Sequence, residues 1–408
     1  MKIIHIADLH FGKTVHGIGY AESGDQEYWL DGFIKLAKEE KPDAVIISGD
    51  LYDRAAPGER AVELCDRLLT GLTDMGVSVF VSAGNHDSGS RLAFCGKLLR
   101  KQKLYIAGSL SAELQHYTLY DEYGAVTFWL MPYIFPAAAA EILGDADIKD
   151  YDTAVRRMIE NQNIDFSERN VISAHQNILA NGIPAERGGS ETSVGGIGEV
   201  SYTVFDGFEY AALGHIHSAQ AMGREAVRYA GSPLCYHFSE TRRPDKGAVI
   251  IELKDKHSAP VIRPVTIAPL HPMREIKGTY AEIENDALTT KNRNEYLRIV
   301  LTDRRLSPEI TDTLRTAYEG KSSLILDWDS EYTISGETAG NSPEKENGDI
   351  VSLFSDFFRL RTGEALGDNE STVITKAAEL CEAYSFPDDL TKAAGILLET
   401  LRKKEDAE

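Results

Sequence analysis

Five hydrophobic segments of this chain each end in residues of the types that bind metal ions. The segments are short and rich in β-branched residues, which is typical of strands buried on both faces of a sheet. Ligand sites in α/β proteins form at the carboxyl ends of strands, so we expect the following side chains to converge. The segments and the residues after them are IIHIA with Asp8 and His10, AVIIS with Asp50 and Asp53, VSVFVS with Asn85, His86 and Asp87, NVISA with His175, and YAAL with His215 and His217.

Helical patterns alternate with these segments through about the first 255 residues. Apolar residues recur at helical spacing in Tyr28–Glu40 and Ala61–Leu72. Alternating strands and helices predict an α/β domain built in layers. The strands are expected at residues 3–7, 44–48, 77–82, 126–133, 170–175, 210–215 and 248–253.

The residue types after the strands also select among metals. They combine carboxylate and amide oxygens with imidazole nitrogens and include no thiolate, which disfavours a structural zinc site. Such a set suits Mn²⁺, Fe²⁺, Co²⁺ or catalytic Zn²⁺. Seven ligands exceed the needs of one ion and suit two ions about 3.5–4 Å apart, a pair that activates water for phosphoryl transfer. The candidate ligands are Asp8, His10, Asp50, Asn85, His175, His215 and His217.

Each motif has an ordinary structural explanation when it is taken alone. A single histidine after a strand is more often a hydrogen-bonded surface residue, and a Gly-Asp pair is usually a turn. The GNHD segment at residues 84–87 could be a loop with asparagine in a left-handed conformation. Five such motifs in order, each at a strand end, make chance an implausible explanation.

The chain is strongly acidic, with 43 Lys and Arg against 64 Asp and Glu and a formal net charge of −21. This charge excludes a protein that coats polyanions non-specifically, and it equally fits a simple role in solubility. A function on nucleic acid would need bound cations, a local basic patch or a basic partner. Basic residues near the motifs either contact phosphates or, as we prefer, are ordinary surface charges: Lys13, Arg54, Arg60 and Arg91.

The cysteines and the N-terminal residues indicate a cytoplasmic protein. Four cysteines lie far apart and form no CxxC motif, as expected for reduced thiols. His5 and Asp8 interrupt the first apolar run, so it does not resemble a signal peptide. No run of 18 apolar residues occurs, so no membrane span is expected.

The pattern changes near residue 268. TYAEIE (279–284) and YLRIVLTD (296–303) suggest strands, followed by a helix over residues 308–320 and a strand SLILDWD (323–329), a small β–β–α–β unit. The stretch 336–349 is rich in Gly, Asn, Ser and charge and is predicted to be a linker. The expected units are 1–268 catalytic, 269–335 a small α+β domain, 336–349 a linker and 350–408 a helical tail.

The tail is acidic and begins with apolar side chains that could form one stripe along a short helix. Such a group needs a surface on which to be buried. Two interpretations stay open: the tail packs on its own catalytic domain, or, as we favour, it docks on a partner. The apolar residues are Val351, Leu353, Phe354, Phe357, Phe358 and Leu360.

The motifs DxH, GDxxD, GNHD, a lone His and GHxH together resemble the calcineurin-like metallophosphoesterase superfamily. The resemblance covers about 270 residues. Within the superfamily, the opening MKIIHIADLHFGK and the stretches 193–220 and 228–240 are similar to the SbcD family, the bacterial counterparts of the eukaryotic double-strand-break nuclease. The resemblance implies a layered α/β/β/α sandwich with a small α+β capping domain and a helical C-terminal tail.

The resemblance also implies roles for individual residues. Asp50 would bridge two divalent ions, with Mn²⁺ as the expected metal. His86 would be the catalytic histidine, which protonates the leaving alkoxide or stabilises its charge, and Asp87 could orient it. Asp53 stands where eukaryotic and archaeal relatives have His, so its role is left open. One ion would be held by Asp8, His10, Asp50 and His217, and the other by Asp50, Asn85, His175 and His215.

The function implied by the resemblance is a DNA nuclease for end processing, recombination, replication and repair. It would act as a 3′→5′ exonuclease on double-stranded DNA and as an endonuclease on single strands or hairpins. Its partner would be the SbcC coiled-coil ATPase, bound to a homodimer within a heterotetramer. The alternative is a small-molecule phosphodiesterase or phosphatase, which would not need the extra domain and tail. A non-catalytic scaffold of the same fold is disfavoured because the metal-ligand set is complete.

Overall fold

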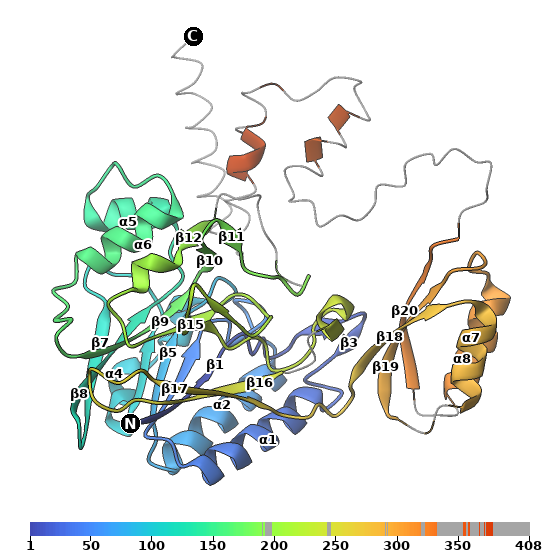
Figure 1. Ribbon diagram of the computed structural model, residues 1–408, viewed down its shortest axis with the longest axis horizontal. Helices are drawn as coiled ribbons and strands as arrows, with labels where there is room; N and C mark the ends of the chain where they lie inside the picture. Colours follow the sequence, from blue (N-terminus) through green and yellow to red (C-terminus); the bar gives the residue numbers. More distant parts are fainter. Residues whose placement is uncertain are drawn as a thin grey trace.

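Two six-stranded sheets that face each other form the larger part of the molecule, and a smaller sheet with two helices lies beside them (Figure 1). The structure is a computed structural model. It describes residues 1–189, 191, 198–242, 246–289, 291, 293–319, 323–332, 354–355, 358–359, 367, 371 and 373–377.

The first sheet carries the strands expected from the N-terminal third of the sequence. Its strands β1, β4, β5 and β6 are parallel, and β16 pairs antiparallel with β1. Every residue of AVIIS is buried, as its continuous β-branched sequence predicts. The spatial order is β17 (Val261–Thr266), β16 (Gly247–Glu252), β1 (Lys2–Ile6), β4 (Ala44–Ser48), β5 (Ser78–Ser82) and β6 (Leu104–Ala107).

The second sheet is built in the same way. Strands β15, β13, β9 and β8 are parallel, and the edge strands β14 and β7 pair antiparallel with their neighbours. The register places Gly214 of β13 opposite His175 of β9, so both strands end at the same level. The order is β14 (Gln220–Met222), β15 (Arg224–Tyr229), β13 (Tyr210–Gly214), β9 (Arg169–His175), β8 (Gly124–Met131) and β7 (Gln115–Asp121).

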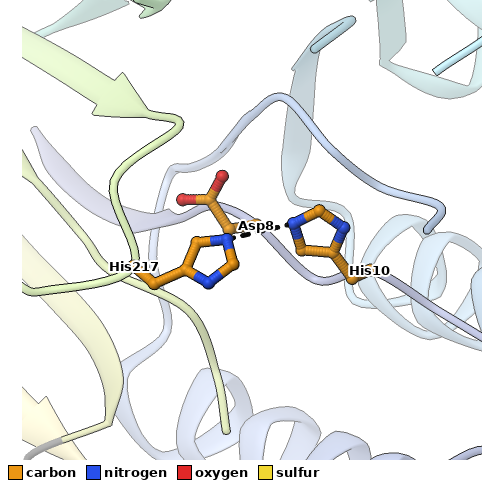
Figure 2. Close-up of side chains that lie close together, drawn as sticks. All are labelled: Asp8, His10 and His217. Atoms are coloured by element: carbon orange, nitrogen blue, oxygen red, sulfur yellow. Dashed lines mark hydrogen bonds between the residues drawn. The ribbon is translucent and has the colours of Figure 1, made fainter. Parts of the chain in front are cut away.

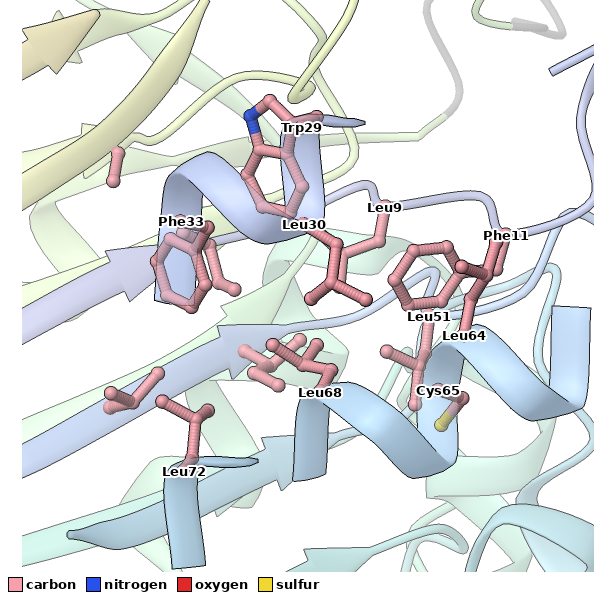
Figure 3. Close-up of a cluster of buried hydrophobic side chains, with 14 of the residues drawn as sticks. Leu9, Phe11, Trp29, Leu30, Phe33, Leu51, Leu64, Cys65, Leu68 and Leu72 are labelled. Atoms are coloured by element: carbon pink, nitrogen blue, oxygen red, sulfur yellow. The ribbon is translucent and has the colours of Figure 1, made fainter. Parts of the chain in front are cut away.

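Three buried clusters show how the layers are stacked. Between the sheets, Phe80 of the first and Phe128 of the second stack with ring centroids 4.3 Å apart. Helices α1 (Asp25–Glu40) and α2 (Glu59–Asp74) cover the outer face of the first sheet (Figure 3). Helix α6 (Tyr151–Glu160) and helix α5 (Pro136–Leu143) belong to the cluster on the outer face of the second. The predicted α/β/β/α sandwich is therefore confirmed.

The core beneath α2 shows why this helix forms. Its buried residues Ala61, Leu64, Cys65, Leu68 and Leu72 recur at spacings of three and four and form one apolar stripe. Burying each leucine contributes about 1.5–3 kcal/mol, more than helix propensity supplies. Figure 3 shows Leu68 facing Leu30 of α1, and Leu64 beside Phe11 and Leu51.

The small domain differs from the expected β–β–α–β unit. Its strands are β18 (Met273–Gly278), β19 (Glu295–Leu301) and β20 (Ser323–Ser330), all parallel, so each connection must cross over. The crossovers are α7 (Tyr280–Thr289) and α8 (Pro308–Glu319).

The prediction of a strand at TYAEIE was wrong because the segment begins with a capping box. Thr279 Oγ1 lies 3.3 Å from the backbone nitrogen of Glu282, whose carboxylate accepts from the Thr279 backbone N–H at 2.8 Å. This reciprocal pair satisfies two N–H groups at the start of a helix and favours helix over strand.

The small domain contacts the two-sheet part of the molecule through Asp25, at the start of α1. This carboxylate is 1% exposed and accepts a hydrogen bond from Tyr296 Oη at 2.8 Å. Its other oxygen lies 2.9 Å from His271 Nδ1. Tyr20 stacks on Tyr296 with ring centroids 5.9 Å apart. A buried carboxylate with two partners from the small domain therefore fixes the junction between the domains.

Several shorter elements complete the described part of the chain. Within it, no helix is long and apolar enough to span a membrane. The predicted linker 336–349 and, from the tail, Val351, Leu353, Phe357 and Leu360 lie outside the described residues. The shorter elements are β2 (Thr14–Val15), β3 (Ile18–Gly19), α3 (Gly89–Leu92), α4 (Gly96–Leu99), β10 (Asn177–Ala180), β11 (Ile183–Pro184), β12 (Glu199–Ser201) and the 3₁₀ turns η1 (Arg100–Gln102), η2 (Tyr202–Phe205) and η3 (Phe238–Arg242).

Candidate metal centre

The candidate ligands all follow the carboxyl ends of parallel strands in the two sheets. Backbone hydrogen bonds align the loops after β1 and β4: the Asp8 N–H donates to Gly49 O at 3.1 Å, and the His10 N–H donates to Asp50 O at 2.9 Å. The His215 N–H donates to the Asp8 carboxylate at 2.8 Å and links the second sheet to the first. Residues more than 200 positions apart therefore meet at one edge of the sandwich.

One group of candidate ligands contains Asp8, His10 and His217 (Figure 2). The Nε2 atoms of the two histidines lie only 3.2 Å apart. One Asp8 carboxylate oxygen lies within 4.8 Å of a ring nitrogen of each histidine. All three residues are buried, with exposed fractions of 3% or less.

A second group forms around His175 and Asn85. His175 Nε2 lies 3.1 Å from Asn85 Oδ1 and 3.2 Å from Asp50 Oδ2. His215 Nδ1 lies 3.2 Å from the same asparagine oxygen. Asp50 Oδ2 also lies 3.6 Å from His10 Nε2 in the first group. One oxygen of Asp50 therefore faces both groups.

Four of these residues have an unusual backbone conformation. The φ angles of Asp8, His10, Asp50 and His215 are 54°, 43°, 50° and 98°, in the region that side chains other than glycine rarely adopt. Each such residue costs on the order of 1–3 kcal/mol and persists only where surrounding contacts hold it. Here the cross-loop hydrogen bonds hold the side chains toward a common centre.

Two glycines in the motifs are required by close packing. A Cβ atom at Gly49 would lie 2.1 Å from His175 Nδ1, and one at Gly84 would lie 2.1 Å from Asp50 Oδ1. Both distances are far below van der Waals contact, so any side chain there would displace a candidate ligand. The glycines of GDxxD and GNHD thus make room for ligands from other strands.

Burial controls the charge of three candidate ligands. It raises the pKa of Asp8 to about 6, although the nearby imidazoles of His175 and His217 oppose this. It lowers the pKa of His10 and of His215 well below the ordinary value, so both rings are neutral at pH 7. Neutral imidazole is the form that binds a metal ion.

For Asp50, His175 and His217, a neighbouring group of opposite charge outweighs the effect of burial on the pKa. Burial alone would raise the pKa of Asp50, but the His175 and His86 imidazoles hold it well below its ordinary value. Burial alone would lower the pKa of His175, but the Asp50 carboxylate raises it to about 9. His217 likewise has a raised pKa, because a hydrogen bond to Glu240 outweighs the effect of burial.

The residues present fit divalent metal ions. Asp8 Oδ2 is fully buried and has no hydrogen-bond partner among the described residues. An unpartnered buried carboxylate oxygen costs several kcal/mol in an ordinary core. The Asp8 carboxylate lies within 4.8 Å of ring nitrogens of His10 and His217, a place that suits a cation. The set of oxygens and nitrogens without a thiolate suits a transition metal.

His86 lies at the centre without belonging to either group described above. Its backbone N–H donates to Asp50 Oδ1 at 2.9 Å, and its Nδ1 lies 2.9 Å from the backbone oxygen of Asp53.

The suggestion that Asp87 orients His86 is not supported by the contacts. The Asp87 carboxylate accepts backbone N–H groups of Leu51, Tyr52 and Gly84 and so joins two loops.

Asp53, whose role the sequence left open, has a clear position. Its carboxylate lies 2.8 Å from Lys13 Nζ and 3.6 Å from His10 Nδ1, on the side of the ring away from His217. Lys13 is therefore paired, as is Arg60 with Glu27 and Glu63. These pairs favour a structural role for the two basic residues over phosphate contacts.

Sequence reasoning missed Glu191 and Glu240. Glu191 accepts hydrogen bonds from the backbone N–H groups of His217, at 2.7 Å, and Gly188, at 2.9 Å. Glu240 Oε1 lies 3.5 Å from Nδ1 of the His217 ring. Neither glutamate follows a strand end, so the pattern that identified the others does not include them. A small pocket at the centre is lined by His10, Asp50, Asn85, His86, Glu191, His215 and His217.

Comparisons with known proteins agree with this geometry. Residues 1–219 match the model of the calcineurin-like phosphoesterase family, and residues 269–362 match the model described as the type 5 capsule protein repressor C-terminal domain. The chain is 29% identical over 379 residues to the SbcD subunit of the nuclease SbcCD from Staphylococcus saprophyticus subsp. saprophyticus, covering 92% of this chain and 97% of the relative. The resemblance inferred from the motifs is thereby confirmed.

A solved structure of glutamine-dependent NAD⁺ synthetase from Acinetobacter baumannii in complex with ADP also aligns with the chain. The identity is 9% and the TM-score 0.28, over 92% of this chain and 70% of that chain. A likeness this weak carries no argument about fold or function.

Proposed function

Because the chain belongs to the calcineurin-like phosphoesterase family, we propose that it is the DNA-cleaving subunit of an SbcCD-type nuclease. The observation that carries the proposal is the convergence of two ligand groups on Asp50. The alignment with an SbcD nuclease subunit along 92% of the chain supports DNA as the substrate.

We assign two divalent metal ions to the centre, with Mn²⁺ as the expected metal. Asp8, His10 and His217 would hold one ion, Asn85, His175 and His215 the other, and Asp50 both. When bound, such ions activate water and neutralise charge on the scissile phosphate. They also offset the net charge of −21, which would otherwise repel a nucleic acid.

Groups of the protein itself orient the His86 ring and supply a proton. The Asp53 carbonyl, 2.9 Å from His86 Nδ1, fixes one edge of the His86 ring. In the doubly protonated ring, the proton on the opposite nitrogen, Nε2, can then pass to the leaving oxygen, while Nδ1 keeps its own proton toward the Asp53 carbonyl. His86 lines the cavity, within reach of a phosphodiester that enters it.

The assay that tests this function compares three substrates. We expect Mn²⁺-dependent cleavage of linear duplex DNA from the 3′ end and of hairpin DNA, with lower activity in Mg²⁺. A small phosphodiester should be a poor substrate. Efficient cleavage of the small substrate with no cleavage of DNA would instead identify a small-molecule phosphodiesterase. No hydrolysis of any substrate by protein that binds metal would favour a scaffold.

We propose an SbcC-type coiled-coil ATPase as partner and a homodimer as the state of this subunit. Two exposed large apolar side chains on the segment that follows the GNHD motif are candidates for the homodimer contact: Phe94 is 75% exposed and Leu98 62% exposed. Phe94→Asp should shift the protein from dimer to monomer in sedimentation, and an unchanged dimer would place the contact elsewhere.

We also propose a cytoplasmic location. Cys65, Cys95 and Cys235 are free in the described part of the chain, which fits a reducing compartment.

A further inference from the structure

The two ring nitrogens of His217 face different surroundings. Nε2 points toward His10 Nε2, 3.2 Å away, at the candidate metal centre (Figure 2). Nδ1 lies 3.5 Å from Glu240 Oε1, on the protein side. Glu240 belongs to the 3₁₀ turn η3 and is 2% exposed.

Glu240 is itself held firmly. Lys246 Nζ donates to Glu240 Oε2 at 2.6 Å, to Ser232 Oγ at 2.8 Å and to the backbone oxygen of His217 at 2.8 Å. Lys246 is 6% exposed, so this ion pair is buried. The lysine therefore fixes both the carboxylate and the backbone of the histidine that the carboxylate contacts.

The other histidine of this group also has a carboxylate near its second ring nitrogen, although the two make no hydrogen bond. His10 Nδ1 lies 3.6 Å from the Asp53 carboxylate, which is paired with Lys13 at 2.8 Å. In the second group, by contrast, His175 Nδ1 contacts a neutral backbone carbonyl, Ser48 O, at 2.8 Å. A carboxylate beside the ring nitrogen that does not bind the metal makes an imidazole a stronger metal ligand. A carbonyl in the same place has a smaller effect.

We propose that Glu240 is a positioning residue, which holds the His217 ring with Nε2 toward the metal and makes the Asp8–His10–His217 site the tighter of the two. The proposal rests on the metal-ligand assignment of the proposed function. The tighter site should fill first when the metal-free protein is titrated with Mn²⁺.

The test is calorimetric titration of Mn²⁺ into the metal-free protein. In Glu240→Gln, the affinity of the tighter step should fall about 10- to 100-fold, the usual effect of removing a carboxylate partner of a ligand, while the weaker step stays unchanged. Because this variant leaves Lys246 buried without its carboxylate, the double variant Glu240→Gln/Lys246→Met should be measured beside it. Both should show the same selective loss.

Glu209→Gln is the matched control. Glu209 contacts Lys256 and accepts from the Asn170 N–H at 2.5 Å, at the amino end of β13, opposite the metal centre. This variant should leave both Mn²⁺ affinities unchanged. An equal loss of Mn²⁺ affinity at both binding steps in the Glu240 variants would show a merely structural role. Unchanged Mn²⁺ affinities at both steps would overturn the proposal.

A measurement on the unaltered protein keeps the proposal testable if both variants fail to fold. In ¹⁵N spectra of metal-free protein labelled at histidine, His217 should carry its proton on Nδ1. A proton on Nε2 with an unprotonated Nδ1 would overturn the role of Glu240. Unaltered protein that binds no Mn²⁺ would instead refute the proposed function, so the two failures are distinguishable.

Discussion

Asp50 is the side chain on which the two ligand groups meet. Its Oδ2 lies 3.2 Å from His175 Nε2 and 3.6 Å from His10 Nε2, and its Oδ1 accepts the His86 N–H. A single substitution here removes an oxygen from both groups at once. The residue therefore joins the metal-binding and catalytic parts of the centre.

We predict that Asp50→Ala lowers metal content by more than one ion per chain and abolishes hydrolysis. Elemental analysis of the purified variant, beside unaltered protein, measures the first effect. Two Mn²⁺ ions still bound per chain would show that Asp50 does not bridge them.

His86 has a different predicted phenotype because its Nδ1 is already engaged by the Asp53 carbonyl. His86→Ala should keep both metal ions and DNA binding but lower the cleavage rate by about 10²–10⁴, the usual contribution of a positioned acid. Single-turnover cleavage together with metal analysis checks this. Since one His86 nitrogen lies within 4.8 Å of His10 and Asp50 ligand atoms, loss of an ion in the variant would identify His86 as a ligand instead.

At the scale of elements, the strands β7 and β9 are joined by a buried ion pair at the end opposite the metal centre. Arg169, 2% exposed, donates to both oxygens of Asp121, at 3.1 and 2.5 Å. Burial alone would raise the pKa of Asp121, but Arg169 outweighs it and holds the pKa well below its ordinary value. The charged carboxylate therefore stabilises the folded state.

We predict that Asp121→Asn lowers the free energy of unfolding at pH 7 by about 3–5 kcal/mol, since it leaves the buried charge of Arg169 without its carboxylate partner. Because the folded-state pKa is depressed, this stabilisation is present above the unfolded pKa of about 4 and is lost as pH falls through the folded pKa. Urea unfolding at several pH values should show the difference between the two proteins shrinking in acid.

Glu160→Gln serves as the control for this experiment. Glu160 pairs with Arg157, and both side chains are 53% exposed. Removing an exposed pair should change stability by less than about 1 kcal/mol. An Asp121 effect no larger than the control would refute the role of the buried pair.

At the scale of the whole molecule, the small domain is fixed to the catalytic domain through Asp25, Tyr296 and His271. Aromatic rings continue from this junction toward the metal centre. The ring centroids of Tyr20 and Tyr236 are 6.0 Å apart, and those of Tyr236 and His10 are 5.6 Å apart. The two domains therefore share one continuous set of packed side chains.

The acidic tail is predicted to bind the ATPase partner. Removing residues 341–408 should abolish stable assembly with an SbcC-type protein while Mn²⁺-dependent cleavage of short single strands persists. A short amphipathic helix gains its stability from the surface it binds, so its removal should not harm the catalytic domain. Co-purification measures the effect, and a truncated chain that assembles at normal stoichiometry would refute docking. Aggregation or loss of metal would mean that the tail packs on its own catalytic domain.

Local sequence was sufficient to predict seven strands of the two large sheets, helices α1, α2 and α8 and the residue types at the centre, but not strands β6, β7, β14, β15 and β17. AVIIS is a buried strand because five consecutive apolar or small residues suit a position covered on both faces. The segment TYAEIE is part of a helix rather than the predicted strand because the Thr279–Glu282 capping box begins it. Both results follow from interactions within a few residues of the chain.

Only the tertiary structure decided which residues stand next to one another at the centre. The left-handed backbone of Asp8 and His10 is held by loops from other strands, and Glu240 meets His217 through a turn that carries no strand-end pattern. Strand pairing brings β1 and β13 to one edge although some 200 residues separate them. The sequence by itself therefore determined which chemical groups are present, whereas long-range packing determined their distances, charges and partners, because these depend on contacts between segments remote in the chain.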